Sequence, residues 1–81
     1  MANQKEIDAV WAKARMIAGR DPNLYRLDPY RNVIYKPAYG TQGPMGWEID
    51  HRMPESKGGP DKLHNKQPLQ TTTNRKKSDK L

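Results

Sequence analysis

Large apolar side chains are so scarce in this chain that a stable fold is expected to bury nearly all of them. Only 33% of the 81 residues are apolar, and phenylalanine is absent. A chain of this length forms one domain with a small core. We therefore predict a single domain over residues 1–81, in which the spacing of the few apolar residues decides the fold.

The first segment has the apolar spacing of a helix. The residues that would share one helical face are Ile7, Val10, Trp11, Ala14, Ile17 and Ala18. Asn3, with Glu6 three positions later, is typical of a helix start, and Gly19 before Asp21-Pro22 is typical of a helix end. We predict an amphipathic helix over about residues 4–18 that packs through Trp11.

Residues 20–46 are rich in Tyr, Pro and Gly, which favours turns and short strands. Asp28-Pro29-Tyr30-Arg31-Asn32 has the composition of a turn, and Val33-Ile34-Tyr35 has that of a strand. The four tyrosines of this segment could stack on nucleic-acid bases. In a chain without Phe, we interpret them instead as half-buried core residues. The segment is predicted to be a supporting loop and hairpin region.

The last part of the chain has the pattern of two strands and a helix, which makes the predicted fold class α+β. Trp47 and Ile49 alternate with Glu48 and Asp50, so a strand here has one apolar and one acidic face. Pro68 cannot donate to a neighbouring strand, so its own strand is expected at an edge. The predicted elements are a strand, a loop, a second strand and a helix, over 47–50, 52–64, 66–70 and about 72–80.

Basic residues are concentrated in the second part of the chain. Residues 1–50 contain seven Lys and Arg against six Asp and Glu, whereas residues 51–81 contain eight against three. The excess follows directly after Asp50-His51, where a polyanion would dock. A basic tail that only keeps the chain soluble explains this asymmetry less well.

The chain contains no cysteine. A disulfide framework and a thiolate zinc site are therefore not expected. No apolar run approaches the roughly 18 residues of a membrane span, and the charged N-terminal segment is unlike a signal peptide. We expect a cytoplasmic protein that does not contact membranes.

Asp50, His51 and Asn74 carry side chains suited to the hydrolysis of a phosphate ester. The carboxylate of Asp50 and the carbonyl oxygen of Asn74 can together hold Mg²⁺. His51 can act as a general base that takes a proton from water. Strict alternation along a strand would send Asp50 and His51 to opposite faces, so a shared site requires the strand to end or bulge at this pair.

Asn65 and Lys77 are predicted to support this site. The backbone carbonyl of Asn65 can hold the second ring nitrogen of His51, while its side chain pins the loop. Lys77 lies one helical turn beyond Asn74, where it can clamp a phosphate. The other candidates for phosphate contacts are Arg75, Lys76, Arg52 and Lys57.

These residues resemble the HNH nuclease motif of the ββα-metal fold. The matching positions, all within residues 46–80, are Asp50-His51, Pro54, Gly58-Gly59, Asn65, Pro68-Leu69, Asn74 and Lys77. The resemblance implies a ββα-metal finger in which Asp50 and Asn74 are metal ligands. It also implies His51 as the general base and Asn65 as the residue that orients it.

Two departures from the family pattern affect the expected metal. The last motif residue is Asn74 rather than His, so this is a His-Asn-Asn variant. An all-oxygen site favours Mg²⁺, with Mn²⁺ as a substitute, over Zn²⁺. The paired cysteines of many relatives are also missing, so no structural zinc is expected.

Three functions are compatible with these features. The first is a metal-dependent endonuclease that hydrolyses phosphodiester bonds, with DNA favoured over RNA as the substrate. The second is an HNH-like nucleic-acid-binding module with little turnover. The third is a basic interaction protein that works in a larger complex, with a protein partner or as a homodimer. The intact Asp50-His51 pair favours the endonuclease.

Overall fold

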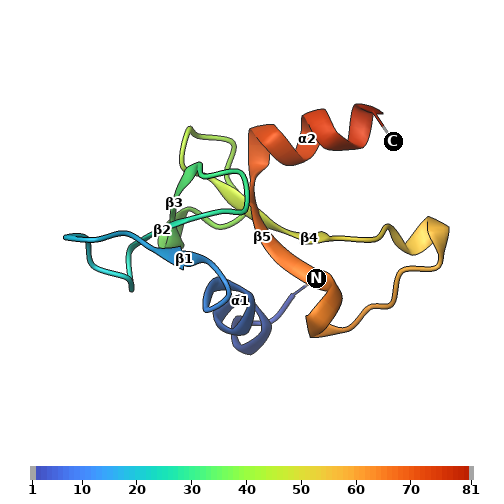
Figure 1. Ribbon diagram of the computed structural model, residues 1–81, viewed down its shortest axis with the longest axis horizontal. Coiled ribbons are helices and arrows are strands. Elements are labelled where there is room, and N and C mark those ends of the chain that lie inside the picture. Colours follow the sequence, from blue (N-terminus) through green and yellow to red (C-terminus); the bar gives the residue numbers. More distant parts are fainter. Residues whose placement is uncertain (1, 81) are drawn as a thin grey trace.

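Two small sheets and two helices form the α+β fold of the computed structural model, which describes residues 2–80 and the side chains of residues 2–77. At its centre, β4 (Trp47–His51) pairs antiparallel with β5 (Lys66–Gln70). The C-terminal helix α2 (Thr71–Lys80) continues directly from β5, and α1 (Gln4–Trp11) also contacts β5. The two helices lie on opposite sides of the central strand pair (Figure 1). Neither helix is long and apolar enough to cross a membrane.

The segment between α1 and β4 forms a three-stranded antiparallel sheet. Its strands, in pairing order, are β1 (Arg15–Met16), β2 (Tyr25–Leu27) and β3 (Val33–Tyr35). The prediction of a strand at β3 is confirmed, whereas β1 and β2 were not predicted as strands. Among the described residues, three short 3₁₀ helices lie at Lys36–Ala38, Glu55–Lys57 and Leu63–Asn65.

The N-terminal helix begins where the sequence predicts but ends earlier. Asn3 caps α1 by accepting a hydrogen bond from the N–H of Glu6 at 2.8 Å. The helix ends at Trp11, so the predicted extension over residues 4–18 is wrong. Gly19, which was expected to stop the helix, lies instead between β1 and β2 with a φ of 80°.

Pairing with β2 accounts for the early end of α1. Arg15–Met16 form β1 opposite Arg26–Leu27, and this extended conformation is incompatible with a helix. The guanidinium of Arg26 donates to the carbonyls of Ala12 and Ala14 at 3.3 and 3.2 Å. A side chain thereby satisfies carbonyl groups just past the helix end. Apolar spacing contains no information about this distant partner.

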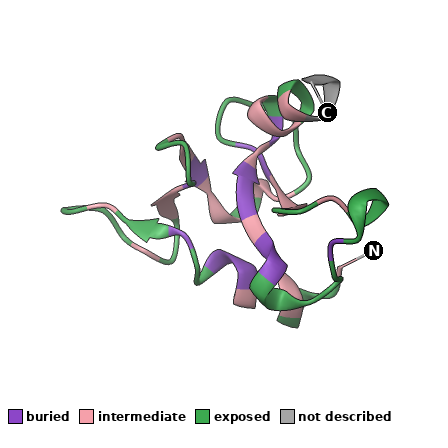
Figure 2. Cartoon of the chain, turned by 45° about the vertical axis from the view of Figure 1, so that its right-hand side comes forward, coloured by how far each residue is buried: buried purple, intermediate pink, exposed green. Residues whose placement is uncertain are grey.

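The core is built around two tryptophans. Trp47 is fully buried and packs against Trp11 and Tyr39, with ring centroids 5.3 and 5.0 Å apart. The indole N–H of Trp47 donates to the carbonyl of Lys36 at 3.2 Å, so its polar atom is satisfied. The other buried members of this cluster are Val10, Ala14 and Ile34. Much of β5 is buried as well (Figure 2).

Several large apolar side chains lie outside this core, contrary to the expectation from composition. The exposed ones are Met16, Leu24, Tyr30, Met45, Met53 and Leu63. Three tyrosines are half-buried as predicted, and two of them, Tyr25 and Tyr35, stack with centroids 5.0 Å apart. The two indole rings supply much of the buried area, so the core needs fewer aliphatic side chains.

The buried carboxylate of Asp28 joins the two sheets. Asp28 is only 4% exposed. It accepts hydrogen bonds from the backbone N–H groups of Tyr30 (2.9 Å), Asn32 (2.8 Å) and Gln70 (3.0 Å). Gln70 is the last residue of β5, so this carboxylate ties the turn before β3 to the central strand pair.

Replacement of Asp28 should therefore destabilise the whole domain. Asp28→Ala leaves three backbone N–H groups without their acceptor, and we expect a loss of about 2–4 kcal/mol in the free energy of unfolding. Urea denaturation followed by tryptophan fluorescence measures this loss. Asp21→Ala is the control, since the Asp21 carboxylate accepts an exposed bond from the N–H of Asn23. Equal losses in the two variants would contradict the role assigned to Asp28.

Candidate active site

The end of β4 brings Asp50 and His51 into one site. Pairing is regular up to this point, with Asp50 opposite Gln67 and His51 opposite Lys66. The strand therefore does not bulge at the pair but ends there, which was one of the two arrangements expected. Both side chains line the same pocket although they alternate along the strand.

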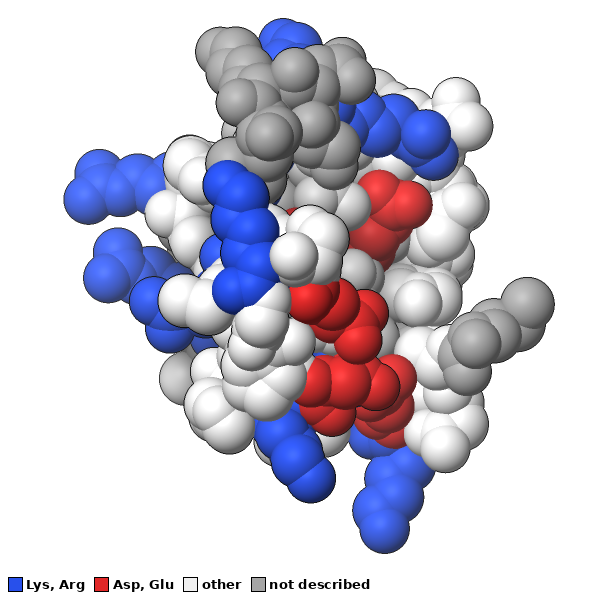
Figure 3. All heavy atoms as spheres, turned by 90° about the vertical axis from the view of Figure 1, so that its right-hand side faces the viewer, with Lys and Arg blue, Asp and Glu red and all other residues white. Residues whose placement is uncertain are grey.

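This open pocket has a volume of about 420 Å³ and contains several of the predicted site residues. They are Asp50, His51, Asn74, Lys77 and Lys57. On this side of the molecule, acidic side chains gather in the middle and Lys and Arg side chains lie around them (Figure 3). The two predicted metal ligands and the predicted base are thus neighbours.

Asp50 is the most enclosed acid of the pocket. Its side chain is 12% exposed, and its Oδ2 accepts hydrogen bonds from Lys77 Nζ at 2.6 Å and Gln67 Nε2 at 2.9 Å. Lys77 was predicted to clamp a phosphate, but in this structure its ammonium is paired with Asp50. A carboxylate with so little solvent requires a cation beside it, and here Lys77 provides one.

Asn74 reaches the pocket from the first turns of α2. Its Nδ2 donates to Glu48 Oε1 at 3.1 Å, and Glu48 lies on the same face of β4 as Asp50. Since the amide nitrogen faces Glu48, the carbonyl oxygen is the atom that could bind a cation. Arg75, which was predicted to contact phosphate, lies 3.9 Å from the other oxygen of Glu48. Its guanidinium is therefore partly paired with an acidic side chain of the same protein.

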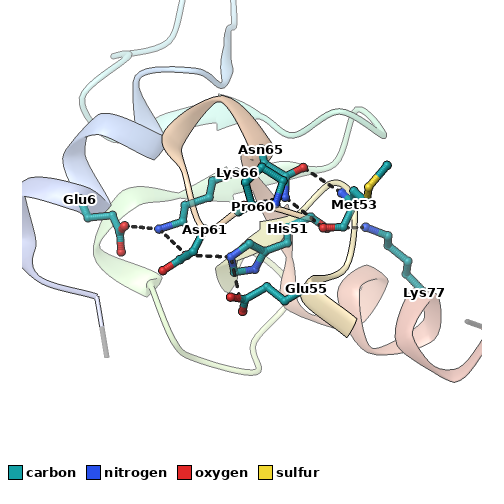
Figure 4. A network of polar contacts seen from close by, with 9 residues as sticks. All are labelled: Glu6, His51, Met53, Glu55, Pro60, Asp61, Asn65, Lys66 and Lys77. Carbon is teal, nitrogen blue, oxygen red and sulfur yellow. Dashed lines mark hydrogen bonds and ion pairs between the residues drawn. The ribbon is translucent and has the colours of Figure 1, made fainter. Parts of the chain in front are cut away.

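His51 is held by a carboxylate from the loop between β4 and β5. Its Nε2 lies 2.9 Å from Asp61 Oδ1 and 3.8 Å from Glu55 Oε1. Asp61 also pairs with the buried ammonium of Lys66 at 3.0 Å, and Lys66 in turn contacts Glu6 of α1. This chain of polar contacts runs from the N-terminal helix to the predicted base (Figure 4).

The contact with Asp61 determines which nitrogen of His51 can accept a proton. An ionised carboxylate only accepts hydrogen bonds, so the neutral ring donates from Nε2. Nδ1 is then the basic atom. Hydrogen bonds from His51 and Lys66 hold the pKa of Asp61 below its usual range, which favours the ionised form that this arrangement needs. Contacts with Glu6 and Asp61 raise the pKa of Lys66.

Asn65 has one of its two predicted roles. Its buried side chain pins the loop, because Oδ1 accepts from the N–H of Met53 (2.9 Å) and Nδ2 donates to the carbonyls of Met53 (3.0 Å) and Pro60 (2.9 Å). Its backbone carbonyl accepts from the N–H of Arg52 at 2.7 Å. The prediction that this carbonyl holds the ring of His51 is wrong, because Asp61 holds the ring instead.

The two glycines of this loop meet separate requirements. Gly58 has a φ of 88°, a conformation that side chains disfavour. Gly59 is buried, and a Cβ there would lie 1.9 Å from the carbonyl oxygen of Met53. Together they let the loop fold back so that Asp61 reaches His51.

The oxygen-rich side of the pocket fits a hard divalent cation. Asp50, Asn74 and the neighbouring Glu48 all offer oxygen atoms, which Mg²⁺ and Mn²⁺ prefer. The ammonium of Lys77 occupies Asp50 Oδ2 at 2.6 Å, so an ion at this carboxylate would have to take the place of Lys77. A second donor set consists of His51, Glu55 and Asp61, whose ligand atoms lie within 4.8 Å of one another. Because this set includes His51, an ion bound to it would prevent the ring from acting as the predicted base.

The remaining predicted phosphate contacts are scattered around the site. Lys76 is exposed on α2, and Arg52 is exposed beside a different pocket. Asp61, Lys66 and Gln67 were not predicted as site residues. Their residue types alone do not indicate a functional site. Their positions near Asp50 and His51 depend on the folding of the loop and on the β4–β5 register.

Of the motif residues, Asp50, His51, Pro54, Asn74 and Lys77 thus line one pocket, whereas Asn65 and the two glycines shape the loop beside it. Comparisons with models of protein families, with functionally characterised proteins and with solved structures found no significant match to this chain. Arguments about its function therefore depend on the chemistry and geometry of these residues.

The role of Asp61 predicts a pH-dependent contribution to stability. Because its pKa is lowered in the folded chain, its ionised form stabilises the fold above the ordinary carboxyl pKa of about 3.9. That contribution disappears as the pH falls through the lowered pKa. The difference in urea midpoint between wild type and Asp61→Asn should be largest near neutral pH and shrink under strongly acidic conditions.

Lys62→Gln provides a control for changing one charge in the same exposed loop. Its effect on the urea midpoint should not follow the profile of Asp61→Asn. A difference between wild type and Asp61→Asn that is constant with pH would show that the carboxylate of Asp61 does not make these contacts in solution.

Proposed function

We propose that this protein is a metal-dependent endonuclease that hydrolyses phosphodiester bonds in nucleic acid, with DNA favoured over RNA. The observation that carries the proposal is one pocket lined by Asp50, His51, Asn74 and Lys77. It combines oxygen ligands, a histidine with an available nitrogen and basic groups for phosphate. The resemblance of the same residues to the HNH motif supports the proposal independently of the geometry.

His51 acts as the general base. Asp61 keeps the proton of the ring on Nε2, so Nδ1 can take a proton from water as the water oxygen attacks phosphorus. The bond from phosphorus to the leaving ester oxygen breaks, and that oxygen takes a proton from solvent. With only a quarter of its side chain exposed, His51 loses little freedom when it adopts the working orientation.

Asp50 and Asn74 would hold the divalent ion, most favourably Mg²⁺, with Mn²⁺ as a substitute. When bound, such an ion stabilises the negative charge that develops on the phosphate oxygens. Asp50 supplies the anionic ligand, and its bond from Gln67 fixes the orientation of the carboxylate. Asn74 supplies a neutral ligand on a helix that begins directly after β5.

Lys77 and Lys57 would contact the substrate. Both line the pocket, and Lys57 is exposed at its rim. If Asp50 held a divalent ion, the ammonium of Lys77 would no longer be needed as its partner and could contact a phosphate. Lys77 would thereby pair with Asp50 in the free protein and with a substrate phosphate in the complex.

A nucleic-acid-binding module without turnover is the second candidate. The ion pair between Lys77 and Asp50, at 2.6 Å, favours it, because Asp50 is neutralised without any metal. In that case the basic residues around the pocket would still bind phosphates. The two candidate functions differ in whether cleavage occurs and depends on a divalent ion and on His51.

A plasmid cleavage assay distinguishes the endonuclease from the binding module. With Mg²⁺ or Mn²⁺, wild type should convert supercoiled plasmid to nicked or linear forms, and a chelator should abolish this. His51→Ala should lower the rate about 10²-fold or more, the usual size of a general-base loss, while its affinity for DNA in chelator stays unchanged. The mechanism attributes this loss to the chemical step alone.

His64→Ala is the matched control, because His64 is the only other histidine and is exposed outside the pocket. It should cleave as wild type does. Metal-independent DNA binding without cleavage would favour the module, and equal activity of His51→Ala and His64→Ala would show that His51 is not the base.

A further inference from the structure

Two adjoining pockets on another part of the surface are lined by basic residues. One has a volume of about 400 Å³ and the other about 300 Å³, and they share Lys13 and Pro29. Their basic lining residues are Lys13, Arg15, Arg31, Arg52 and Lys66. Their acidic lining residue is Asp28.

Two of these basic residues are occupied within the fold. Lys66 is buried between Glu6 and Asp61. Lys13 donates to the backbone carbonyls of Leu63, at 2.7 Å, and Lys66. Neither ammonium is therefore available to a partner without breaking contacts that hold the loop and β5.

The three arginines are different. Arg15, Arg31 and Arg52 are exposed, and none forms an ion pair with a described residue. Asp28 does not neutralise them, since it is buried and its oxygens accept hydrogen bonds from the backbone and from Asn32. We name these three residues the arginine face.

The positive field of the arginine face acts on its neighbours. Partial desolvation lowers the pKa of the Lys13 ammonium, and the charge of Arg52 lowers it further. Adding more positive charge here is thus unfavourable for the folded chain alone. A bound anion would reverse that cost.

Arg31 adds a backbone argument. It is the one described residue other than glycine with a positive φ, at 67°. A side chain in this left-handed conformation costs about 1 kcal/mol relative to glycine. The turn would be more stable with glycine, so the presence of an arginine points to a use for its side chain outside the fold.

We propose that the arginine face binds the phosphate backbone of nucleic acid on the stretch beyond the cleavage site. The choice of nucleic acid as the binding partner rests on the proposed function. Arg52 of the arginine face follows His51 directly in the chain, although the two residues line different pockets. Gln67 connects these pockets, since it lines the smaller basic pocket while donating to Asp50. Three guanidinium groups without acidic partners among the described residues match a repeating phosphate chain better than an isolated anion.

The test measures binding of a fluorescent DNA duplex by anisotropy, in chelator and over a range of KCl concentrations, so that no cleavage is involved. Arg15→Gln/Arg31→Gly should lower the slope of log K against log salt by about two units and weaken binding roughly 50-fold at 0.1 M salt. Arg31→Gly relieves the backbone strain, so a lower affinity would not reflect unfolding. Thermal unfolding of the variant checks this directly.

Two matched variants complete the design. Lys5→Gln/Arg20→Gln removes the same charge from exposed residues outside both basic pockets and should change the slope much less. Arg15→Lys/Arg31→Lys keeps the charge and should keep most of the slope. If the arginine-face variant binds no worse than the Lys5/Arg20 variant, the proposal is overturned.

The outcome is independent of catalysis. If wild type does not cleave but the arginine-face variant loses DNA binding, the nuclease proposal fails and the arginine face stands. If wild type cleaves and the variant binds duplex normally, the arginine face fails and the nuclease stands. Polyglutamate as a competitor tests for an acidic protein partner, and tighter binding of polyglutamate than of the duplex would also overturn the proposal.

Discussion

The pairing of β4 with β5 is the interaction on which the rest of the structure depends. Its register places Trp47 opposite Gln70 at one end and His51 opposite Lys66 at the other. One end of β4 therefore enters the core while the other enters the candidate active site. Because α2 continues from β5 and α1 packs on it, the same pairing also positions both helices. A change in register would disrupt core and site together.

The fold could be predicted where local patterns decide it. Alternation of apolar and polar residues located β4, and the capping signal at Asn3 located the start of α1. The end of α1 could not be predicted, because the helical spacing through Ala18 competes with strand pairing at Arg15–Met16. Likewise, composition alone could not show that two tryptophans fill a core that leaves residues such as Met16 exposed.

For the candidate site, the sequence predicted that Asp50, His51, Asn74 and Lys77 lie close together but not how they are connected. Asp50, His51 and Asn74 share a pocket because they lie at the ends of adjacent elements, as their spacing suggested. The partner of His51 was predicted wrongly, since Asp61 reaches it only after the glycine loop folds back. Long-range contacts of this kind depend on loop conformation, which residue types and spacing do not specify.

Mn²⁺ titration of isotope-labelled protein followed by NMR tests most directly whether Asp50 and Asn74 hold a divalent ion. Paramagnetic broadening should be strongest at the side-chain amide of Asn74, and it should be lost in Asp50→Asn. Mg²⁺ at equal concentration controls for effects of charge alone and should compete with Mn²⁺. Broadening that survives Asp50→Asn, or that is centred on Glu55 and Asp61, would contradict the account, as would no broadening at millimolar Mn²⁺.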